Sequence, residues 1–336
     1  MMVVSPTGVK FFRELILSLE GLGAVPIALR NYTDFPEIIG NDFDLFVHPK
    51  YLGRSVSILD RLVKSLGGEV THVHRRNYFV ALWIEFPDTD LPIHLDFYHG
   101  PQQWHGMSYL GIPLLNHHRR LFFGSFEFYI PAPEHEAMML LLSNLLWGGR
   151  FKTRYREDIR MIGSDEGVRD RFLALLNQVF GSFGVSLGES ILCDRQDINI
   201  EHSTSKRLRW KLFKHCFYQS PLKWFRGWSA HWNGEVRSYL WEKPGMTVRL
   251  PDSEMGRCAA QSISIAVGSY FGETLTFVRG ENPLISWWRR FRALGKNQLL
   301  FEYVDTESDR VMPEELVKTI KAENLIKAQR VIAALA

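Results

Sequence analysis

The first hundred residues alternate between two hydrophobic periods. Segments with apolar residues at helical spacing are separated by short apolar runs of strand length. The expected elements, in chain order, are helices over 6–20 and 49–66 and strands over 24–30, 42–47, 68–74, 78–86 and 91–99. The last two strands alternate with period two around the turn Pro87-Asp88-Thr89-Asp90, which predicts a β-hairpin. We therefore expect a small α/β sandwich that ends near Pro131.

The pattern changes twice after that point. Helical periodicity dominates from residue 133 onward, over 133–147, 150–162 and 169–184. Near Trp241 it gives way to a short apolar strand, a loop and a further helix pattern. The sequence therefore predicts an α/β protein in three parts: 1–131, 132–240 and 241–336.

Composition and charge narrow the class of protein only slightly. The 336 residues include 46% hydrophobic and 23% charged residues, and the net charge of +3 implies no particular partner. Three widely spaced cysteines, Cys193, Cys216 and Cys258, lack metal-binding spacing and are typical of a reduced compartment. The N-terminal segment lacks a signal-peptide pattern and no apolar run has membrane-spanning length, so we expect a cytoplasmic protein.

Basic and aromatic residues are interleaved, without any acid, over 206–228. One interpretation is a helix pair whose aromatic face packs against a neighbour while its lysines and arginines remain in water. The other is peripheral attachment to an anionic membrane surface or a polyanion. The sequence favours packing, with the segment serving as a structural linker.

Two aspartates, Asp42 and Asp44, interrupt the apolar strand expected over 42–47. Residues i and i+2 of a strand point to the same side, so these carboxylates project together while Phe43 and Leu45 face the core. Adjacent buried carboxylates need a shared proton or a bound divalent cation. A shared proton suits acids from separate loops, whereas aspartates on one strand suit an oxygen-coordinated ion such as Mg²⁺.

A third carboxylate is expected on a neighbouring strand, and Asp96 supplies it between two apolar residues. Three aspartates on adjacent strands can hold two Mg²⁺ ions against a nucleoside triphosphate, and Asp96 can also take a proton. His94 shares the face of Asp96, as its partner or as a structural histidine. A lone D-x-D also occurs in surface turns and Ca²⁺ loops, but the apolar flanks and the third acid favour a metal centre.

The segments "ALRNYTDFPE", "IGNDFDLFV" and "HLDFYHG" resemble the nucleotidyltransferase superfamily with its polymerase-β-like palm. More narrowly, they look like bacterial nucleotidyltransferase-like proteins linked to surface-polysaccharide clusters. The resemblance covers 25–158. It implies a small mixed-sheet palm followed by a helical region, with Asp42 and Asp44 as the metal-binding pair, Asp96 as the third acid, Mg²⁺ as cofactor and an NTP as substrate.

The chain departs from this family where the triphosphate would bind. Characterised members carry a Gly-Ser at the end of the first strand, and this sequence has Arg30-Asn31 there. The guanidinium of Arg30 can grip a phosphate and Asn31 can donate a hydrogen bond. Lys152 and Arg154, which follow the long helix, are further candidates for nucleotide contact. The departure leaves open whether an NTP is the donor.

The C-terminal part resembles a thymidylate-kinase-like P-loop domain, as found in the same relatives. A P-loop reads G-x-x-x-x-G-K-[ST], and the matching window here runs from Pro251 to Cys258. Only Gly256 is kept, because Pro251, Arg257 and Cys258 replace the first glycine, the lysine and the hydroxyl residue. We therefore expect a degenerate, shortened domain without catalysis.

These observations favour a Mg²⁺-dependent nucleotidyltransferase. It would move a nucleotidyl group from an NTP to a hydroxyl or phosphate acceptor on a sugar or glycan precursor. One alternative is a non-catalytic nucleotide- or partner-binding scaffold in surface-polysaccharide assembly. Another is a nucleic-acid-modifying enzyme of the same superfamily, which the near-neutral charge disfavours.

Overall fold

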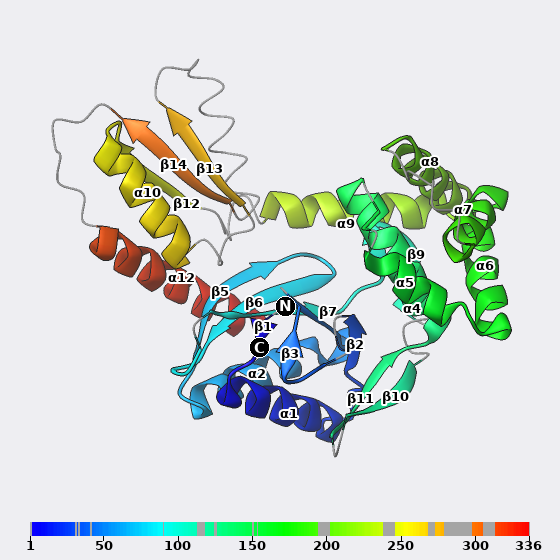
Figure 1. Ribbon diagram of the computed structural model, residues 1–336, viewed down its shortest axis with the longest axis horizontal. Helices are drawn as coiled ribbons and strands as arrows, with labels where there is room; N and C mark the ends of the chain where they lie inside the picture. The colour runs from blue at the N-terminus through cyan, green and yellow to red at the C-terminus, as the bar shows by residue number, and fades with distance from the viewer. Residues whose placement is uncertain are drawn as a thin grey trace. The chain divides into compact units, whose positions relative to one another are not determined.

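The computed structural model shows a mixed α/β protein (Figure 1). It describes residues 2–30, 32, 34–40, 42–89, 91–112, 118–123, 126–149, 151–152, 154–193, 202–237, 246–267, 273–278, 298–304 and 313–335. By contacts the chain forms two compact units. The first comprises Met1–Pro26, Asn31–His99 and Asn233–Ala336, and the second comprises Ile27–Arg30 and Gly100–Trp232. The three-part division at 131/132 and 240/241 stays a prediction.

A mixed seven-stranded sheet, in the order β10-β11-β2-β4-β7-β6-β5, confirms the predicted α/β class. Its strands are β2 (Ile27–Arg30), β4 (Phe43–Phe46), β5 (Glu69–Arg75), β6 (Phe79–Glu85), β7 (Ile93–Tyr98), β10 (His118–Phe123) and β11 (Phe126–Pro131). β4 runs parallel to β7, and the predicted hairpin of β6 and β7 is antiparallel. The pairing of β10 with β11, the hairpin of β8 (Gln102–Trp104) with β9 (Met107–Leu110) and the pair of β1 (Met2–Val3) with β3 (Ile38–Ile39) were not predicted.

Helices α1 (Pro6–Gly21) and α2 (Leu52–Ser65) follow the predicted pattern closely. Ser5 caps α1 by accepting a hydrogen bond of 3.1 Å from the amide of Gly8, and Pro6 occupies its first turn. Phe12 of α1 contacts Phe43 of β4, with ring centroids 5.2 Å apart. Phe43 and Leu45 are fully buried, as predicted. This apolar side of β4 therefore forms the core of the first unit.

The opposite side of the same strands is named here the carboxylate face. Asp44 of β4 pairs with Asp96 of β7, and Asp96 pairs with Ala81 of β6, so these three side chains share one side of the sheet. By the alternation of β6, Trp83 lies on this side too. The carboxylate face thus has an acidic part on β4 and β7 and an apolar part on β6.

The C-terminal elements of the first unit cover the apolar part of the carboxylate face. They are β12 (Met246–Pro251), α10 (Glu254–Val267), β13 (Glu273–Val278), β14 (Gln298–Val304) and α12 (Pro313–Leu335). Strands β12, β14 and β13 form a parallel three-stranded sheet in that order. Ala81 and Trp83 belong to one buried cluster with Val248, Leu250, Ile263 and Phe301. Neither β13 nor α12 was expected from the sequence.

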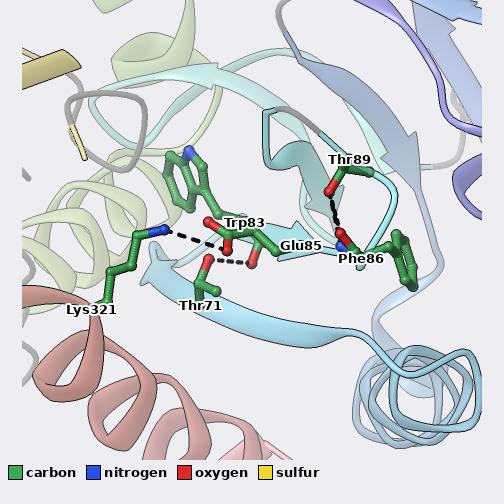
Figure 2. A network of polar contacts seen from close by, with 6 residues as sticks. All are labelled: Thr71, Trp83, Glu85, Phe86, Thr89 and Lys321. Carbon is green, nitrogen blue, oxygen red and sulfur yellow. Dashed lines mark hydrogen bonds and ion pairs between the residues drawn. The ribbon is translucent and has the colours of Figure 1, made fainter. Parts of the chain in front are cut away.

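Polar contacts join the same elements along β5 and β6 (Figure 2). Lys321 of α12 lies 3.8 Å from the carboxylate of Glu85, at the end of β6. The hydroxyl of Thr71 on β5 donates a hydrogen bond of 3.3 Å to the carbonyl of Trp83. Because β5 ends the strand order, the packing of α12 along it protects an edge strand.

The second unit is mainly helical beyond β11. Its helices are α4 (Pro133–Ser143), α5 (Arg154–Ile162), α6 (Glu166–Phe180), α7 (Ser182–Leu192), α8 (His202–Gln219) and α9 (Pro221–Arg237). The helix expected over 133–147 ends at Ser143 and continues as a π-helical turn, η2 (Asn144–Gly148). The basic-aromatic segment forms the helix pair α8–α9. Its aromatic side chains do not all pack against a neighbour as expected, because Trp210, Trp228 and Trp232 are exposed.

Candidate metal centre

Asp42, Asp44 and Asp96 converge at one point of the carboxylate face. Each supplies a carboxylate oxygen, and these three oxygens lie within 4.8 Å of one another. Asp44 and Asp96 are directly opposite each other on the parallel strands β4 and β7. Asp42 lies two residues before Asp44, immediately before β4. The predicted convergence of the three carboxylates on neighbouring strands is confirmed.

The surrounding apolar residues hold this geometry in place. Phe43, between Asp42 and Asp44, stacks on Phe35 with ring centroids 4.2 Å apart and ring planes 5° from parallel. On β7, Leu95 and Phe97 flank Asp96 and are fully buried on the other side of the sheet. Alternation then directs both carboxylates away from the core, because successive side chains of a strand point to opposite sides.

Without a bound cation, the burial of these negatively charged carboxylates destabilises the folded protein. Asp44 is 0% exposed, Asp96 is 7% exposed and Asp42 is half-buried. Ionised carboxylates at such short separations repel one another, and burial adds a desolvation cost. Carboxylate oxygens are also the ligands that Mg²⁺ and similar hard cations prefer. The donor set therefore fits a divalent metal ion.

His94 is the basic neighbour of this centre. Its Nε2 lies 3.0 Å from Oδ1 of Asp96. Burial by itself lowers the pKa of this imidazole, but the close contact with Asp96 and the charges of Asp96, Asp42 and Asp44 outweigh it, so the pKa is raised. The contact places the imidazole against one carboxylate oxygen of Asp96.

Trp83 and Tyr78 complete the surroundings of Asp96, and the sequence analysis assigned neither a role. The indole of Trp83 stacks on His94, with ring centroids 4.2 Å apart and planes 13° from parallel. Burial, with a smaller effect of Asp96, raises the pKa of the Tyr78 phenol against the opposing charge of Arg76, which keeps the phenol neutral. The hairpin register, in which Trp83 faces His94, was the sequence signal that could have identified Trp83.

The residues expected to contact nucleotide are less well defined. Arg30 is the last residue of β2 and is half-buried. Lys152 is exposed in the segment before α5, and Arg154 is the first residue of α5. Asn31 and the side chain of Arg154 lie outside the described residues. The roles of all four in nucleotide binding stay predictions.

The P-loop-like segment forms the expected strand, loop and helix. Only Asp252 and Ser253 separate β12 from α10, and Gly256 lies within the first turn of the helix. The hydroxyl of Ser253 accepts a hydrogen bond of 3.2 Å from the amide of Gly256. The guanidinium of Arg257 pairs with Asp252 at 3.0 Å. Arg257, which stands at the position of the phosphate-binding lysine, thus has an internal carboxylate partner.

No family model matches this chain, and no curated protein matches it. Among solved structures, it is similar to an antigenic nucleotidyltransferase-like protein from Paracoccidioides brasiliensis, with 14% identity over 62% of this chain and 95% of that one, at a TM-score of 0.33. It is also similar to JHP933 from Helicobacter pylori, with 13% identity over 66% of this chain and 99% of that one, at a TM-score of 0.31. At these values the likeness by itself establishes neither the fold nor the activity of this chain.

Proposed function

We propose that the protein is a Mg²⁺-dependent nucleotidyltransferase. It transfers a nucleotidyl group from an NTP to a hydroxyl or phosphate acceptor, with a sugar or glycan precursor as the acceptor class. The observation that carries the proposal is the meeting of Asp42, Asp44 and Asp96, with three carboxylate oxygens within 4.8 Å, on adjacent parallel strands of a mixed sheet. Two buried acids and a half-buried third, placed this close together, destabilise the fold unless a cation binds them, and they suit a metal that holds a triphosphate.

The aspartates divide two tasks in this mechanism. Asp42 and Asp44 would hold the metal, and Asp96 would contact it from the neighbouring strand. When bound, Mg²⁺ neutralises phosphate charge and lowers the pKa of an attacking hydroxyl. His94, at 3.0 Å, orients Asp96 so that its other oxygen remains available.

The reaction is a substitution at the α-phosphorus of the NTP. The acceptor oxygen forms a bond to this phosphorus, and the bond from phosphorus to the bridging oxygen breaks, so pyrophosphate leaves with the bonding electrons. The proton of an acceptor hydroxyl passes to the carboxylate of Asp96 and then to solvent. A phosphate acceptor that is already ionised needs no such transfer.

A non-catalytic nucleotide- or partner-binding scaffold is the second candidate. Two observations favour it. Arg30 occupies the position at which family members carry the Gly-Ser. In addition, Arg257 is paired with Asp252 rather than left open for a phosphate. In this case the centre would bind a metal and a ligand without turnover.

The decisive test replaces one metal ligand without changing its size. Asp44→Asn should lower nucleotidyl transfer by on the order of a thousandfold, because a lost metal contact removes several kcal/mol of transition-state stabilisation. The fold should remain intact or become more stable without metal, because one of three mutually repelling charges is gone. Pyrophosphate release from each NTP, with a panel of sugar and sugar-phosphate acceptors, is the activity measured.

Asp170→Asn is the matched control, because Asp170 is an exposed aspartate on α6. It should retain full activity. Near wild-type turnover in Asp44→Asn would contradict the metal assignment. The scaffold candidate predicts instead that NTP and Mg²⁺ together raise thermal stability, by about 2.7 kcal/mol at a hundredfold excess over Kd, while no pyrophosphate is released.

A further inference from the structure

The helix pair α8–α9 carries a partly exposed stripe of aromatic rings. The stripe consists of Trp210, Phe213 and Phe217 on α8 and Trp224, Trp228 and Trp232 on α9, and is named here the aromatic stripe. The spacings of three and four residues place each set on one side of its helix. Phe213 and Phe217 both contact Trp224, with ring centroids 5.5 Å apart, so the stripe crosses continuously from one helix to the other.

The inner sides of both helices are occupied by other contacts. The hydroxyl of Ser205 on α8 bonds to the carbonyl of Leu145, and the guanidinium of Arg209 donates to the carbonyl of Leu146 at 2.7 and 3.0 Å. On α9, His231 Nε2 lies 2.8 Å from Nδ1 of His105. A Cβ on Gly227 would fall against the backbone of Gly106, so α9 approaches the β8–β9 turn closely. On α9, Gly227 and His231 lie three and seven residues beyond Trp224 and therefore on its side of the helix, which leaves Trp224 half-buried while Trp228 and Trp232 reach the surface.

Four of the six rings of the stripe are exposed, and Phe213 and Trp224 are half-buried. Trp210, Phe217, Trp228 and Trp232, with Tyr218, Leu222 and Phe225 beside them, each expose between 37 and 77% of their surface. A helix of a globular protein normally turns its large apolar residues inward. Clustered apolar exposure of this extent typically marks an interaction site.

The charged residues of the segment that carries the aromatic stripe are all basic. Between Glu201 and Glu235 the sequence contains no Asp or Glu. Lys206, Arg207 and Lys214 are exposed on α8, and the ammonium of Lys214 lies 5.2 Å from the centre of the Trp210 ring. Lys214 thus lies against a ring of the stripe, and Arg207 lies nearby over Phe183 of α7, at 4.2 Å from the ring centre. A basic surface with exposed rings suits a partner that is anionic at its surface and apolar beneath.

We propose that the aromatic stripe and its flanking lysines and arginines dock the protein on an anionic membrane surface. Tryptophan prefers the boundary between lipid headgroups and acyl chains, and Lys and Arg are attracted to anionic headgroups. None of the described helices is long and apolar enough to cross a bilayer, so the contact is peripheral. The proposal does not depend on the proposed function.

Two other occupants fit the surface less well. Single-stranded nucleic acid needs open ring faces on which bases stack. Here Trp210 stacks on Phe213 and Trp224 on Trp228, with ring planes 11° and 17° from parallel, so these rings occupy one another's faces. A second copy of the chain, joined through the same surface, would bring cations against cations.

The test is co-sedimentation of the full chain with phosphatidylcholine vesicles that do or do not contain phosphatidylglycerol. Binding should require the anionic lipid and weaken as salt rises. The triple variant Lys206→Gln, Arg207→Gln, Lys214→Gln should lower the partition coefficient by on the order of a hundredfold at low salt. Trp210→Ser with Trp228→Ser should lower it at every salt concentration, because the apolar contribution is not screened.

The matched control, Lys10→Gln, Lys50→Gln, Lys64→Gln, removes the same charge from exposed lysines of the first unit and should leave binding unchanged. Thermal unfolding confirms that each variant is folded, and the charge variant keeps the test valid if the tryptophan variant is not. The proposal is overturned if the wild type does not bind anionic vesicles or if the control loses as much binding as the triple variant of α8. It is also overturned if an oligonucleotide binds the surface while vesicles do not. Self-association that the Trp210→Ser, Trp228→Ser variant abolishes would also overturn it.

Discussion

The imidazole of His94 stacks on the indole of Trp83, with ring centroids 4.2 Å apart, while its Nε2 lies 3.0 Å from Asp96. Trp83 in turn belongs to the buried cluster that includes Val248, Leu250 and Phe301 of the C-terminal elements. A continuous series of packed side chains therefore connects the C-terminal part of the first unit with the third acid of the metal centre.

His94 should act as a positioning residue for Asp96. His94→Ala removes the close contact with Oδ1 of Asp96 and should weaken the affinity for Mn²⁺ or Mg²⁺ about tenfold to a hundredfold, because partners of metal ligands typically have effects of this size. His94→Gln retains a donor and should recover part of the loss. Metal titration by calorimetry measures both, and unchanged affinity in His94→Ala would refute the role. His118→Gln, at an exposed position on β10, is the control.

Replacing Trp83 should lower both the stability of the fold and the affinity for metal. The residue is 6% exposed, so Trp83→Ala should cost about 3–5 kcal/mol of unfolding free energy through the cavity it leaves. Ile263→Ala truncates the same cluster at α10, and no ring contact joins its aliphatic side chain to His94. Both variants should unfold at lower denaturant concentration, but only Trp83→Ala should also weaken metal affinity. Equal metal affinities under conditions where both are folded would show that the stacking has no such effect.

The P-loop-like segment should not contribute to nucleotide binding. Arg257 is exposed and paired with Asp252, and Cys258 is exposed on α10. Arg257→Ala and Cys258→Ala should therefore change NTP-dependent stabilisation or turnover less than about twofold, and stability by less than about 0.5 kcal/mol, as for most surface substitutions. Loss of either property in a folded variant would mean that this segment binds phosphate after all.

His99 should make the fold sensitive to acid. Burial, with the charge of Arg75, lowers the pKa of this imidazole from 6.5 to about 4. In the unfolded chain His99 becomes protonated below pH 6.5, whereas in the folded protein it stays neutral until about pH 4. The free energy of unfolding therefore keeps its full value above pH 6.5 and decreases as the pH falls toward 4. The loss should amount to about 2–3 kcal/mol.

Urea unfolding of the wild type and of His99→Gln, compared between about pH 7 and pH 5, measures this contribution. The difference in stability between the two proteins should shrink as the pH falls. His74, whose pKa burial also lowers, should leave a residual acid sensitivity in the variant. An unchanged difference across this range would show that His99 titrates normally in the folded protein.

The local pattern of the sequence determined several secondary-structure elements and part of the candidate metal centre. The hydrophobic periods predicted α1, α2 and the β6–β7 hairpin, because helix and strand geometry impose different spacings on the buried side. The i, i+2 spacing of Asp42 and Asp44 predicted that their carboxylates project together, and the apolar neighbours of Asp96 predicted a third acid beside them. These inferences held because they depend on residues close in sequence or on adjacent strands.

Tertiary structure decided what depends on long-range pairing. The parallel register that sets Asp44 opposite Asp96 joins segments fifty residues apart, and local spacing does not specify it. Similarly, only the folded chain shows that the C-terminal elements pack on Trp83, and thereby next to His94. The interleaved rings and cations of 206–228 suggested an aromatic face packed inward. Instead, Ser205 and Arg209 bond to the carbonyls of Leu145 and Leu146, and Gly227 lies against the backbone of Gly106, where a larger side chain would prevent the close approach.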